Sequence, residues 1–324
     1  MSAAPTVSVV IPTYNRARFL GAAVASVRAQ TYPCLEILIV DDGSTDDTAQ
    51  VVAALGNGIR YITQPNAGPA AAHNRGIQDA HGDLVAFLDT DDRWLPEKTA
   101  RQVALMMARP AVALVTADEA LENGVGENLF ASNFSRRNIV EQMRLSPDGV
   151  VSNSPALLLQ VNFISTSTVL ARRSVLVALD GFNPQLHYGE DLDLWLRIAA
   201  RSEIGSLATV EAVRVSHDTN TTKSIEGMLR GYVDLAVVIR GWAGPLMPRW
   251  GVDANRYVAA AMTDLGYWYF TESRMPDARK MFLRSLRERA SARALVYLTA
   301  CALPKGIVQL IRQAKAGTRG AAAR

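Results

Sequence analysis

The chain has 324 residues with a formal net charge of +3; 49% are hydrophobic and 20% charged, a composition that excludes intrinsic disorder over most of the length. This length favours two domains, and two distant cysteines, Cys34 and Cys301, argue against a disulfide framework or a zinc ribbon and indicate a reducing compartment. We find no signal-peptide pattern at the N-terminus and no stretch of about 20 mainly apolar residues that predicts a membrane span.

The first third of the chain alternates short apolar segments with amphipathic ones. In the amphipathic segment at 16–30, Phe19 falls on the same predicted apolar face as Leu20 and Val24. Strands are predicted at 7–11, 35–40, 59–63, 84–88 and 112–116, and helices at 16–30, 45–55, 70–80 and 97–109. This alternation predicts right-handed β-α-β crossovers and a mostly parallel sheet flanked by helices.

The rest of the chain is less regular at first and then helical. Residues 120–150 are predicted to form a loop. A strand at 166–171, helices at 174–179 and 190–201, and strand-like segments around Ile204 and Val213 are expected before His217. From about residue 224 the periodicity is helical. We therefore expect an α/β domain over residues 1–222 and a helical region over residues 223–324.

The C-terminal segment is strongly basic. Twelve Lys and Arg but only two acids lie between Arg274 and Arg324, whereas the rest of the chain holds 22 basic and 29 acidic residues. Because apolar residues such as Leu295 and Ile307 are interleaved with these charges, we expect an amphipathic tail that binds an anionic membrane surface. The alternative is a soluble helical tail that is rich in arginine. No nucleic-acid partner is expected, since the predicted site is acidic.

Three polar clusters follow predicted strands: Pro12–Asn15, Asp41–Ser44 and Asp89–Asp92. Ligands of such sheets bind beyond the carboxyl ends of the strands, so these clusters are expected to form one site. The three carboxylates at 89–92 repel one another unless a cation lies among them, and oxygen ligands of this kind suit Mg²⁺ or Mn²⁺ that is shared with substrate phosphates. The alternative is a solvated acidic turn before a helix.

Five ordered motifs resemble glycosyltransferase family 2. They are VSVVIPTYNR at 7–16, IVDDGSTD at 39–46, GPAAAHNRGI at 68–77, FLDTDD at 87–92 and GEDLDLWLR at 189–197. The resemblance covers about residues 6–222. It implies a glycosyltransferase A (GT-A) fold and transfer of a sugar, with inversion, from a nucleoside diphosphate sugar to an acceptor hydroxyl.

The resemblance also implies which residues bind the donor. Pro12, Thr13 and Tyr14 would hold the nucleotide base, Tyr14 by stacking. Asp42 would accept a hydrogen bond from the base, and Asp89 would serve the ribose and metal region. From the residues alone, Tyr14 is equally an edge aromatic, and residues 41–42 equally belong to an Asp-Gly turn before a helix cap.

Further roles concern the metal and the reaction. By resemblance, Asp91 is expected to ligate the metal that bridges the diphosphate, and Asp191 to be the general base for the acceptor hydroxyl. His217 is expected by resemblance to contact the metal or the diphosphate; the alternative is a neutral histidine on a loop. Glu190 would orient the acceptor or support Asp191. Negatively charged side chains at a helix N-terminus also interact favourably with the helix dipole, and this interaction is expected to keep Asp191 ionised. Asp193 is expected to be solvated.

One motif departs from the family pattern. Family members commonly carry Arg where this chain has His73, so a permanent charge would be replaced by a donor-binding group that titrates near neutrality.

The sequence as a whole indicates a cytoplasmic, peripheral membrane enzyme that adds sugars to a glycan or lipid-linked acceptor during assembly of a bacterial surface polysaccharide. A nucleotidyltransferase or a non-catalytic sugar-binding protein is the alternative.

Overall fold

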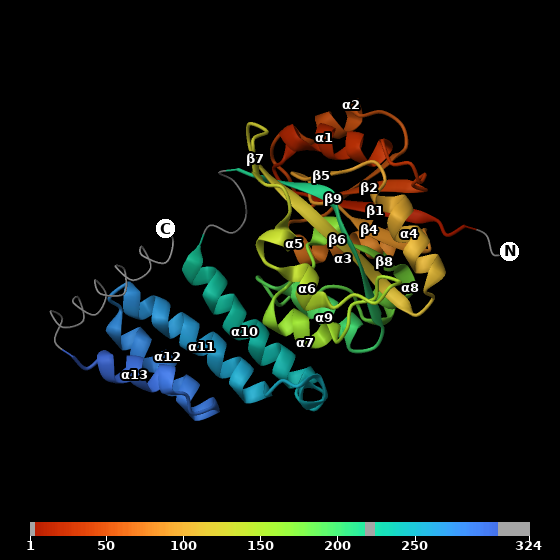
Figure 1. Cartoon of the computed structure of the whole chain (residues 1–324). Coiled ribbons are helices and arrows are strands. Elements are labelled where there is room, and N and C mark those ends of the chain that lie inside the picture. Colours follow the sequence, from red (N-terminus) through yellow and green to blue (C-terminus); the bar gives the residue numbers. More distant parts are fainter. Residues whose placement is uncertain (1–3, 218–223, 304–324) are drawn as a thin grey trace. The chain divides into compact units, whose positions relative to one another are not determined.

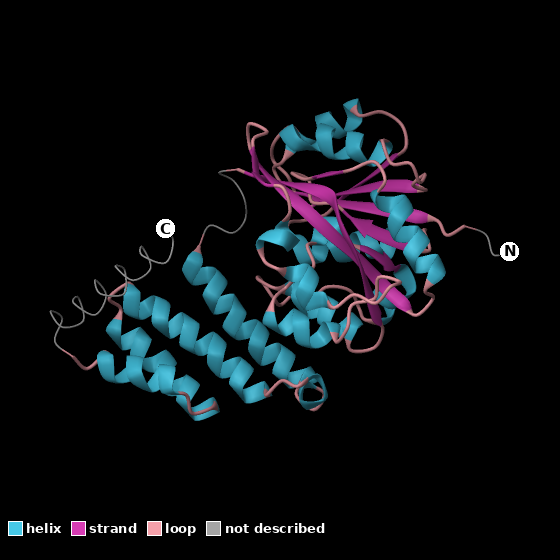
Figure 2. Ribbon diagram, viewed as in Figure 1, coloured by secondary structure: helices cyan, strands magenta, loops and turns pink. Residues whose placement is uncertain are grey.

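In this computed structural model, residues 4–217 and 224–303 are described, and the chain divides into two compact units, Met1–Thr221 and Thr222–Arg324. The first unit is a β-sheet with helices packed on it, and the second consists of helices (Figures 1 and 2). The α/β class predicted for the N-terminal part is confirmed.

The described strands form one nine-stranded sheet in the order β3-β2-β1-β4-β8-β6-β9-β5, with β7 paired to β6. Their bounds are β1 Val7–Thr13, β2 Glu36–Asp41, β3 Ile59–Thr63, β4 Leu84–Phe87, β5 Arg93–Trp94, β6 Val112–Asn123, β7 Asn128–Phe130, β8 Leu170–Arg172 and β9 Glu203–Ser216. The longer pairs, β1 with β2 and β4, β2 with β3, and β6 with β9, are parallel. Short antiparallel pairs attach β5, β7 and β8. The C-terminal ends of β1, β2 and β4 therefore lie at one edge of the sheet.

The helices of the first unit lie against the sheet or connect its strands (Figure 1). They are α1 Ala17–Arg28, α2 Thr48–Ala54, α3 Pro69–Asp79, α4 Lys98–Ala108, α5 Asn133–Arg136, α6 Ile139–Met143, α7 Ser154–Gln160, α8 Arg173–Ala178 and α9 Glu190–Ala199, with a 3₁₀ turn at Thr166–Thr168. The predicted helices are confirmed with ends that differ by a few residues, and Pro69 occupies the first turn of α3, where its missing N–H costs nothing.

The loop predicted for residues 120–150 is wrong. This segment contains the end of β6, then β7, α5 and α6. Helices of four and five residues are too short to show a periodicity, and tertiary contacts stabilise them. The side chains of Phe134, Ile139 and Met143 are buried, and the Ser132 side chain caps α5 by accepting a hydrogen bond from the Ser135 N–H.

Two strand predictions also change. Residues 166–168 form a 3₁₀ turn, so β8 begins only at Leu170, and the segments around Ile204 and Val213 belong to one continuous strand, β9.

Both faces of β1 are buried, which explains its uninterrupted apolar sequence. Val7, Val9 and Ile11 belong to the hydrophobic core on one face. On the other face α3 approaches so closely at Gly76 that a Cβ there would lie 2.3 Å from Cγ1 of Val10. A side chain at position 76 would therefore push α3 away from the strand.

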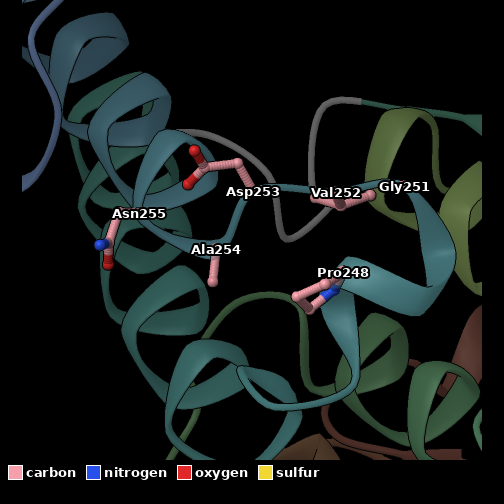
Figure 3. Close-up of a pocket in the computed structure, with 6 residues that line it drawn as sticks. All are labelled: Pro248, Gly251, Val252, Asp253, Ala254 and Asn255. Atoms are coloured by element: carbon pink, nitrogen blue, oxygen red, sulfur yellow. The ribbon is translucent and has the colours of Figure 1, made fainter.

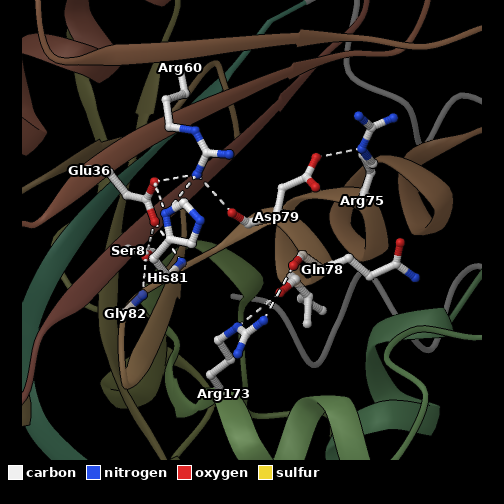
Figure 4. A network of polar contacts seen from close by, with 10 residues as sticks. Ser8, Glu36, Arg60, Arg75, Gln78, Asp79, His81, Gly82 and Arg173 are labelled. Atoms are coloured by element: carbon white, nitrogen blue, oxygen red, sulfur yellow. Dashed lines mark hydrogen bonds and ion pairs between the residues drawn. The ribbon is translucent and has the colours of Figure 1, made fainter.

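A polar network fixes the opposite edge of the sheet, at the N-terminal ends of the strands (Figure 4). The carboxylate of Glu36 accepts hydrogen bonds from Ser8 Oγ at 2.7 Å, Arg60 Nη1 at 2.5 Å and the His81 N–H at 2.7 Å. Arg60 also donates to the carbonyl of Asp79, the last residue of α3. The network therefore ties the C-terminal end of α3 to β2 and β3.

The second unit contains α10 Ile225–Ala243, the 3₁₀ helix Met247–Trp250, α11 Ala254–Thr271, α12 Met275–Glu288 and α13 Ala292–Ala300. Its core includes Met262, Tyr269 and Phe282. Helices α11 and α12 come close at Gly266, where a Cβ would lie 2.9 Å from Cε1 of Phe282. None of the helices in residues 224–303, or in the described part of the first unit, combines the length and the apolar character needed to cross a membrane. The predicted amphipathic segment beyond residue 303, including Ile307, lies outside the described residues.

Candidate functional site

The three polar clusters predicted to share one site are joined at the C-terminal edge of the sheet. The Asp42 N–H donates to the Thr13 carbonyl at 2.9 Å, which links the ends of β1 and β2. The Thr90 hydroxyl donates to the Pro12 carbonyl, which links the acidic turn after β4 to the end of β1. The predicted convergence of these clusters is confirmed.

The end of β1 presents an exposed ring and a buried hydroxyl. The Tyr14 side chain is 48% exposed, which leaves its ring accessible for stacking on a planar base. Thr13 is buried, and its Oγ1 has no hydrogen-bond partner among the described residues. A buried polar atom without a protein partner is uncommon, so this hydroxyl is suited to a ligand.

Asp41 and Asp42 are buried and mainly order their own surroundings. Asp41 accepts hydrogen bonds from the Ser44 N–H and from the Tyr61 hydroxyl. Asp42 accepts three, from Gln64 Nε2 at 2.7 Å and from the backbone N–H groups of residues 67 and 68 at 2.9 and 2.8 Å. A carboxylate has about four acceptor positions, so Asp42 retains capacity for one ligand hydrogen bond while it holds the turn that leads into α3.

The acidic turn after β4 contains one inward and one accessible carboxylate. Asp92 is buried and accepts hydrogen bonds from Ser167 Oγ at 2.6 Å and from the Val215 N–H at 3.2 Å. Burial, together with the charges of Asp89 and Asp91, raises the pKa of Asp92 well above its ordinary value. Asp92 therefore supports the turn, and Asp91, whose side chain is 18% exposed, is the carboxylate available to a cation.

Asp91 meets His217, which lies 126 positions away in the sequence. His217 Nε2 and Asp91 Oδ2 are 2.8 Å apart. Among the described residues, no group of three or more His, Cys, Asp or Glu side chains is arranged to hold a metal. A carboxylate and an imidazole nevertheless fit Mn²⁺ or Mg²⁺ that completes its coordination with substrate phosphate oxygens.

Asp89 carries a strongly perturbed carboxyl group. Burial, followed by the charges of Asp91 and Asp191, raises the pKa of Asp89 to about 7. The charge of Asp191, in the first turn of α9, therefore acts on a carboxyl group of the acidic turn. Because these carboxylates repel one another, their proximity favours either protonation of one of them or binding of a cation.

The predicted base lies in the first turn of α9. Asp191 accepts hydrogen bonds from Asn162 Nδ2 at 3.1 Å and from the Leu192 N–H at 2.7 Å. Burial raises the pKa of Asp191 despite these hydrogen bonds, so burial opposes the stabilisation that the helix dipole is expected to give this carboxylate. Burial and the charge of Asp191 also raise the pKa of Glu190 to about 7.

His73 does not titrate near neutrality, which corrects the sequence-based expectation. Its ring is 5% exposed, stacks on Phe182 at 4.7 Å and meets the edge of Phe87 at 5.3 Å. Its Nδ1 lies 2.9 Å from the Pro69 carbonyl, so this nitrogen carries the proton of the neutral ring. Burial lowers the pKa of His73 to about 4. A donor contact by a charged His73 is therefore not supported.

Asp193 is buried, and the prediction that it is solvated is wrong. It pairs with Arg197 Nε at 2.8 Å, and the side chain of Asp193 is 2% exposed. Asn162 and Ser167 also contact carboxylates of the candidate site, and no sequence motif singles out either residue. Each is a polar residue in a segment without a motif, and only the fold brings it to a carboxylate of the site.

The hollow shown in Figure 3 is separate from these residues. It has a volume of about 380 Å³ and lies in the second unit, where residues 248 and 251–255 line it. Asp253 is its charged residue, and this carboxylate caps α11 by accepting a hydrogen bond from the Arg256 N–H. The lining therefore contains none of the predicted site residues.

A sequence profile described as glycosyl transferase family 2 matches residues 8–176, which is more than half of the chain. The chain belongs to this family. A glycosyltransferase of Rickettsia felis, named as uncharacterized, is 34% identical over 219 residues, covering 66% of this chain and 34% of that protein. The putative teichuronic acid biosynthesis glycosyltransferase TuaG of Bacillus subtilis is 38% identical over 109 residues, covering 32% and 43% of the respective chains. The chain spans about a third of the length of the Rickettsia felis relative.

Two solved structures share the fold of this chain. S. aureus TarS 1-349 in complex with UDP-GlcNAc has a TM-score of 0.64 at 17% identity, covering 88% of this chain and 82% of that one. The mannosyltransferase PcManGT from Pyrobaculum calidifontis, in complex with GDP-Man and Mn²⁺, has a TM-score of 0.54 at 20% identity, covering 99% and 87%. The GT-A fold expected for this family 2 member is therefore confirmed.

Proposed function

We propose that this family 2 protein is a metal-dependent, inverting glycosyltransferase, and that residues 1–222 form its donor-binding and catalytic domain. The observation that carries the proposal is the contact between Asp91 and His217 at the end of β4. The turn that carries Asp91 is joined to the end of β1 by the hydrogen bond from the Thr90 hydroxyl to the Pro12 carbonyl. The complexes of TarS with UDP-GlcNAc and of PcManGT with GDP-Man and Mn²⁺ support a nucleotide sugar as donor.

Donor binding follows from the chemistry at the ends of β1, β2 and β4. The accessible ring of Tyr14 stacks on the base, and the Thr13 hydroxyl and the backbone near Pro12 line the same position. Asp42 accepts a hydrogen bond from the base at its remaining acceptor position. Asp89 faces the ribose and the diphosphate.

Asp91 and His217 would hold Mn²⁺ or Mg²⁺. When bound, the ion neutralises the negative charge that develops on the departing diphosphate. The carboxylate of Asp91 would supply the oxygen ligand that both ions prefer.

Asp191 acts as general base. Its carboxylate takes the proton of the acceptor hydroxyl while the oxygen of that hydroxyl forms a bond to the anomeric carbon, and the bond from that carbon to the diphosphate breaks on the opposite side. The configuration at the anomeric carbon is therefore inverted. Burial raises the pKa of Asp191, which makes it a stronger base, and Asn162 fixes its orientation. Glu190 orients the acceptor.

The acceptor is a glycan or a lipid-linked saccharide in the assembly of a bacterial surface polysaccharide. The similarity to TuaG, named as a putative teichuronic acid biosynthesis glycosyltransferase, supports this class of pathway.

The second unit provides attachment to an anionic membrane surface, at the cytoplasmic face of the membrane. Lys280, Arg284 and Arg287 follow one another at helical spacing along α12 and are exposed, with Leu283 46% exposed between them. On α13, Leu295 and Val296 are 54% and 61% exposed. Each basic residue near an anionic surface contributes about 1 kcal/mol to binding, so the three basic residues of α12 alone would give appreciable, salt-sensitive binding.

A donor screen tests the catalytic proposal. UDP, GDP, CDP and dTDP sugars are added with Mn²⁺, and we expect one nucleotide class to raise the melting temperature and to release its nucleoside diphosphate. Asp91→Asn is expected to abolish both effects. Release of pyrophosphate from a nucleoside triphosphate and a sugar phosphate would instead identify a nucleotidyltransferase, and binding without turnover would identify a sugar-binding protein.

Vesicle sedimentation tests the membrane proposal. We compare the full chain, a chain ending at Leu303, and a variant with Lys280, Arg284 and Arg287 replaced by Gln, on neutral and anionic vesicles. The full chain is expected to pellet with anionic vesicles at low salt. It is expected to be released near 0.5 M salt, where screening shortens the range of interactions between surface charges to about 4 Å. If the full chain stays in the supernatant with anionic vesicles at low salt, the membrane proposal is contradicted. The alternative, a soluble helical tail rich in arginine, then holds.

A further inference from the structure

The Phe19 ring stacks on the imidazole of His217. Their centroids are 4.6 Å apart and their planes differ by 25°. His217 is the residue whose Nε2 meets Asp91 at 2.8 Å, and its side chain is 7% exposed. The guanidinium carbon of Arg18 lies 4.5 Å from the centre of the same Phe19 ring. Arg18, Phe19, His217 and Asp91 therefore form a continuous row beside the site.

Phe19 does not have the core position that its place in the amphipathic pattern predicts. The residues of α1 that are buried in the core are Leu20, Ala23, Val24 and Val27. Phe19 is one position away from this stripe and is only partly buried. Its ring is therefore available to His217, which is the stacking partner observed for it.

The contact with Phe19 limits how the imidazole of His217 can turn. The torsion that rotates an imidazole about its Cβ–Cγ bond is broad and roughly two-fold, so either ring nitrogen can face a given direction. Stacking on Phe19 restricts this rotation, while the Cβ of His217 lies close to the turn after β6, where a Cβ at Gly124 would be 3.8 Å away. Stacking on Phe19 therefore sets the plane of the imidazole, and the 2.8 Å contact with Asp91 sets which nitrogen, Nε2, faces that carboxylate.

We propose that Phe19 is a positioning residue for His217, and that its ring pre-orients the imidazole as the second metal ligand beside Asp91. This inference rests on the proposed function of Asp91 and His217. Phe19 lies in the first turn of α1, the helix that follows the predicted base-binding residues Thr13 and Tyr14, so binding of the base and orientation of the metal ligand would depend on one short continuous segment of the chain.

The test uses the full chain with Mn²⁺ and UDP, and a parallel series with GDP. Phe19→Leu removes the ring, and Phe19→Met does so with a more flexible side chain if the first variant does not fold. Phe19→Tyr keeps the ring. Phe130→Leu is the matched control, because Phe130 is a partly exposed aromatic that also has an arginine 4.5 Å from its ring but does not stack on a histidine.

Electron paramagnetic resonance measures two quantities, the fraction of Mn²⁺ bound and the ¹⁴N modulation that a coordinated imidazole produces. We expect Phe19→Leu to weaken Mn²⁺ binding about two- to tenfold, the range implied by stacked aromatic pairs, and to reduce the ¹⁴N modulation. Phe19→Tyr and Phe130→Leu are expected to match the wild type in both measurements.

Unchanged Mn²⁺ affinity and ¹⁴N modulation in Phe19→Leu would overturn the positioning role while leaving the metal site intact. An equal loss of Mn²⁺ affinity and ¹⁴N modulation in Phe130→Leu would also overturn the positioning role. Removing any partly exposed aromatic ring would then have the same effect. A wild-type protein that binds no Mn²⁺, or that binds it without ¹⁴N modulation and independently of Asp91→Asn, would overturn the proposed metal site and the positioning role together.

Discussion

The ion pair inside α9 is expected to be a major source of stability for the helix that carries the proposed base. Asp193 is 2% exposed and lies 2.8 Å from Nε of Arg197, whose side chain is 18% exposed. The same guanidinium donates from Nη1 to the Leu179 carbonyl at 2.6 Å and from Nη2 to the Gly181 carbonyl at 2.7 Å. Asp193→Asn keeps the shape of the side chain and removes the charge that compensates Arg197.

The expected loss follows from this burial. Removing one partner of a buried ion pair typically costs about 3–5 kcal/mol, because the other charge stays buried without compensation. Arg197 retains two carbonyl partners and some exposure, so we expect Asp193→Asn to lower the free energy of unfolding by about 2–4 kcal/mol.

Urea denaturation, followed by tryptophan fluorescence, measures the difference, since the indole of Trp195 is fully buried on the same helix. The matched control is Asp79→Asn. Asp79 also pairs with an arginine four positions away, Arg75, but the two side chains are 31% and 43% exposed. This control is expected to cost no more than about 0.5 kcal/mol. If the two variants lose equal stability, the argument from burial is refuted.

Three further predictions concern the site. Asp91→Asn should lower turnover by several orders of magnitude with the fold intact and should weaken nucleotide-sugar binding in Mn²⁺; full wild-type activity in excess EDTA would contradict the metal role. Asp191→Asn should retain donor binding by calorimetry and lose transfer, and loss of donor binding as well would assign Asp191 to structure or metal binding. Because burial raises the pKa of Glu190 to about 7, its folded state binds a proton that the unfolded state releases above pH 4.5. Metal-free protein should therefore lose stability as the pH rises from about 4.5 to 7, by up to about 1.4 kcal/mol per pH unit for this group; Glu190→Gln should reduce that slope in melting curves, and an unchanged slope would contradict the assignment.

Local patterns determined the architecture of the first unit. Apolar segments such as Val7–Thr13 become buried parallel strands because both faces of the strand must be covered, and an amphipathic segment must pack one face on the sheet. The polar clusters that end β1, β2 and β4 were predictable as one site, since parallel strands of one sheet bring their C-terminal ends to the same edge.

Tertiary contacts determined what each site residue does. Asp91 and His217 are 126 positions apart, and no local pattern encodes their contact. His73 and Asp193 sit in motifs that look solvent-accessible, yet packing places the first among aromatic rings and the second in a buried ion pair. Periodicity is a property of a few neighbouring residues, whereas burial, ionisation and ligand geometry depend on every element that surrounds a side chain, so only the folded chain fixes them.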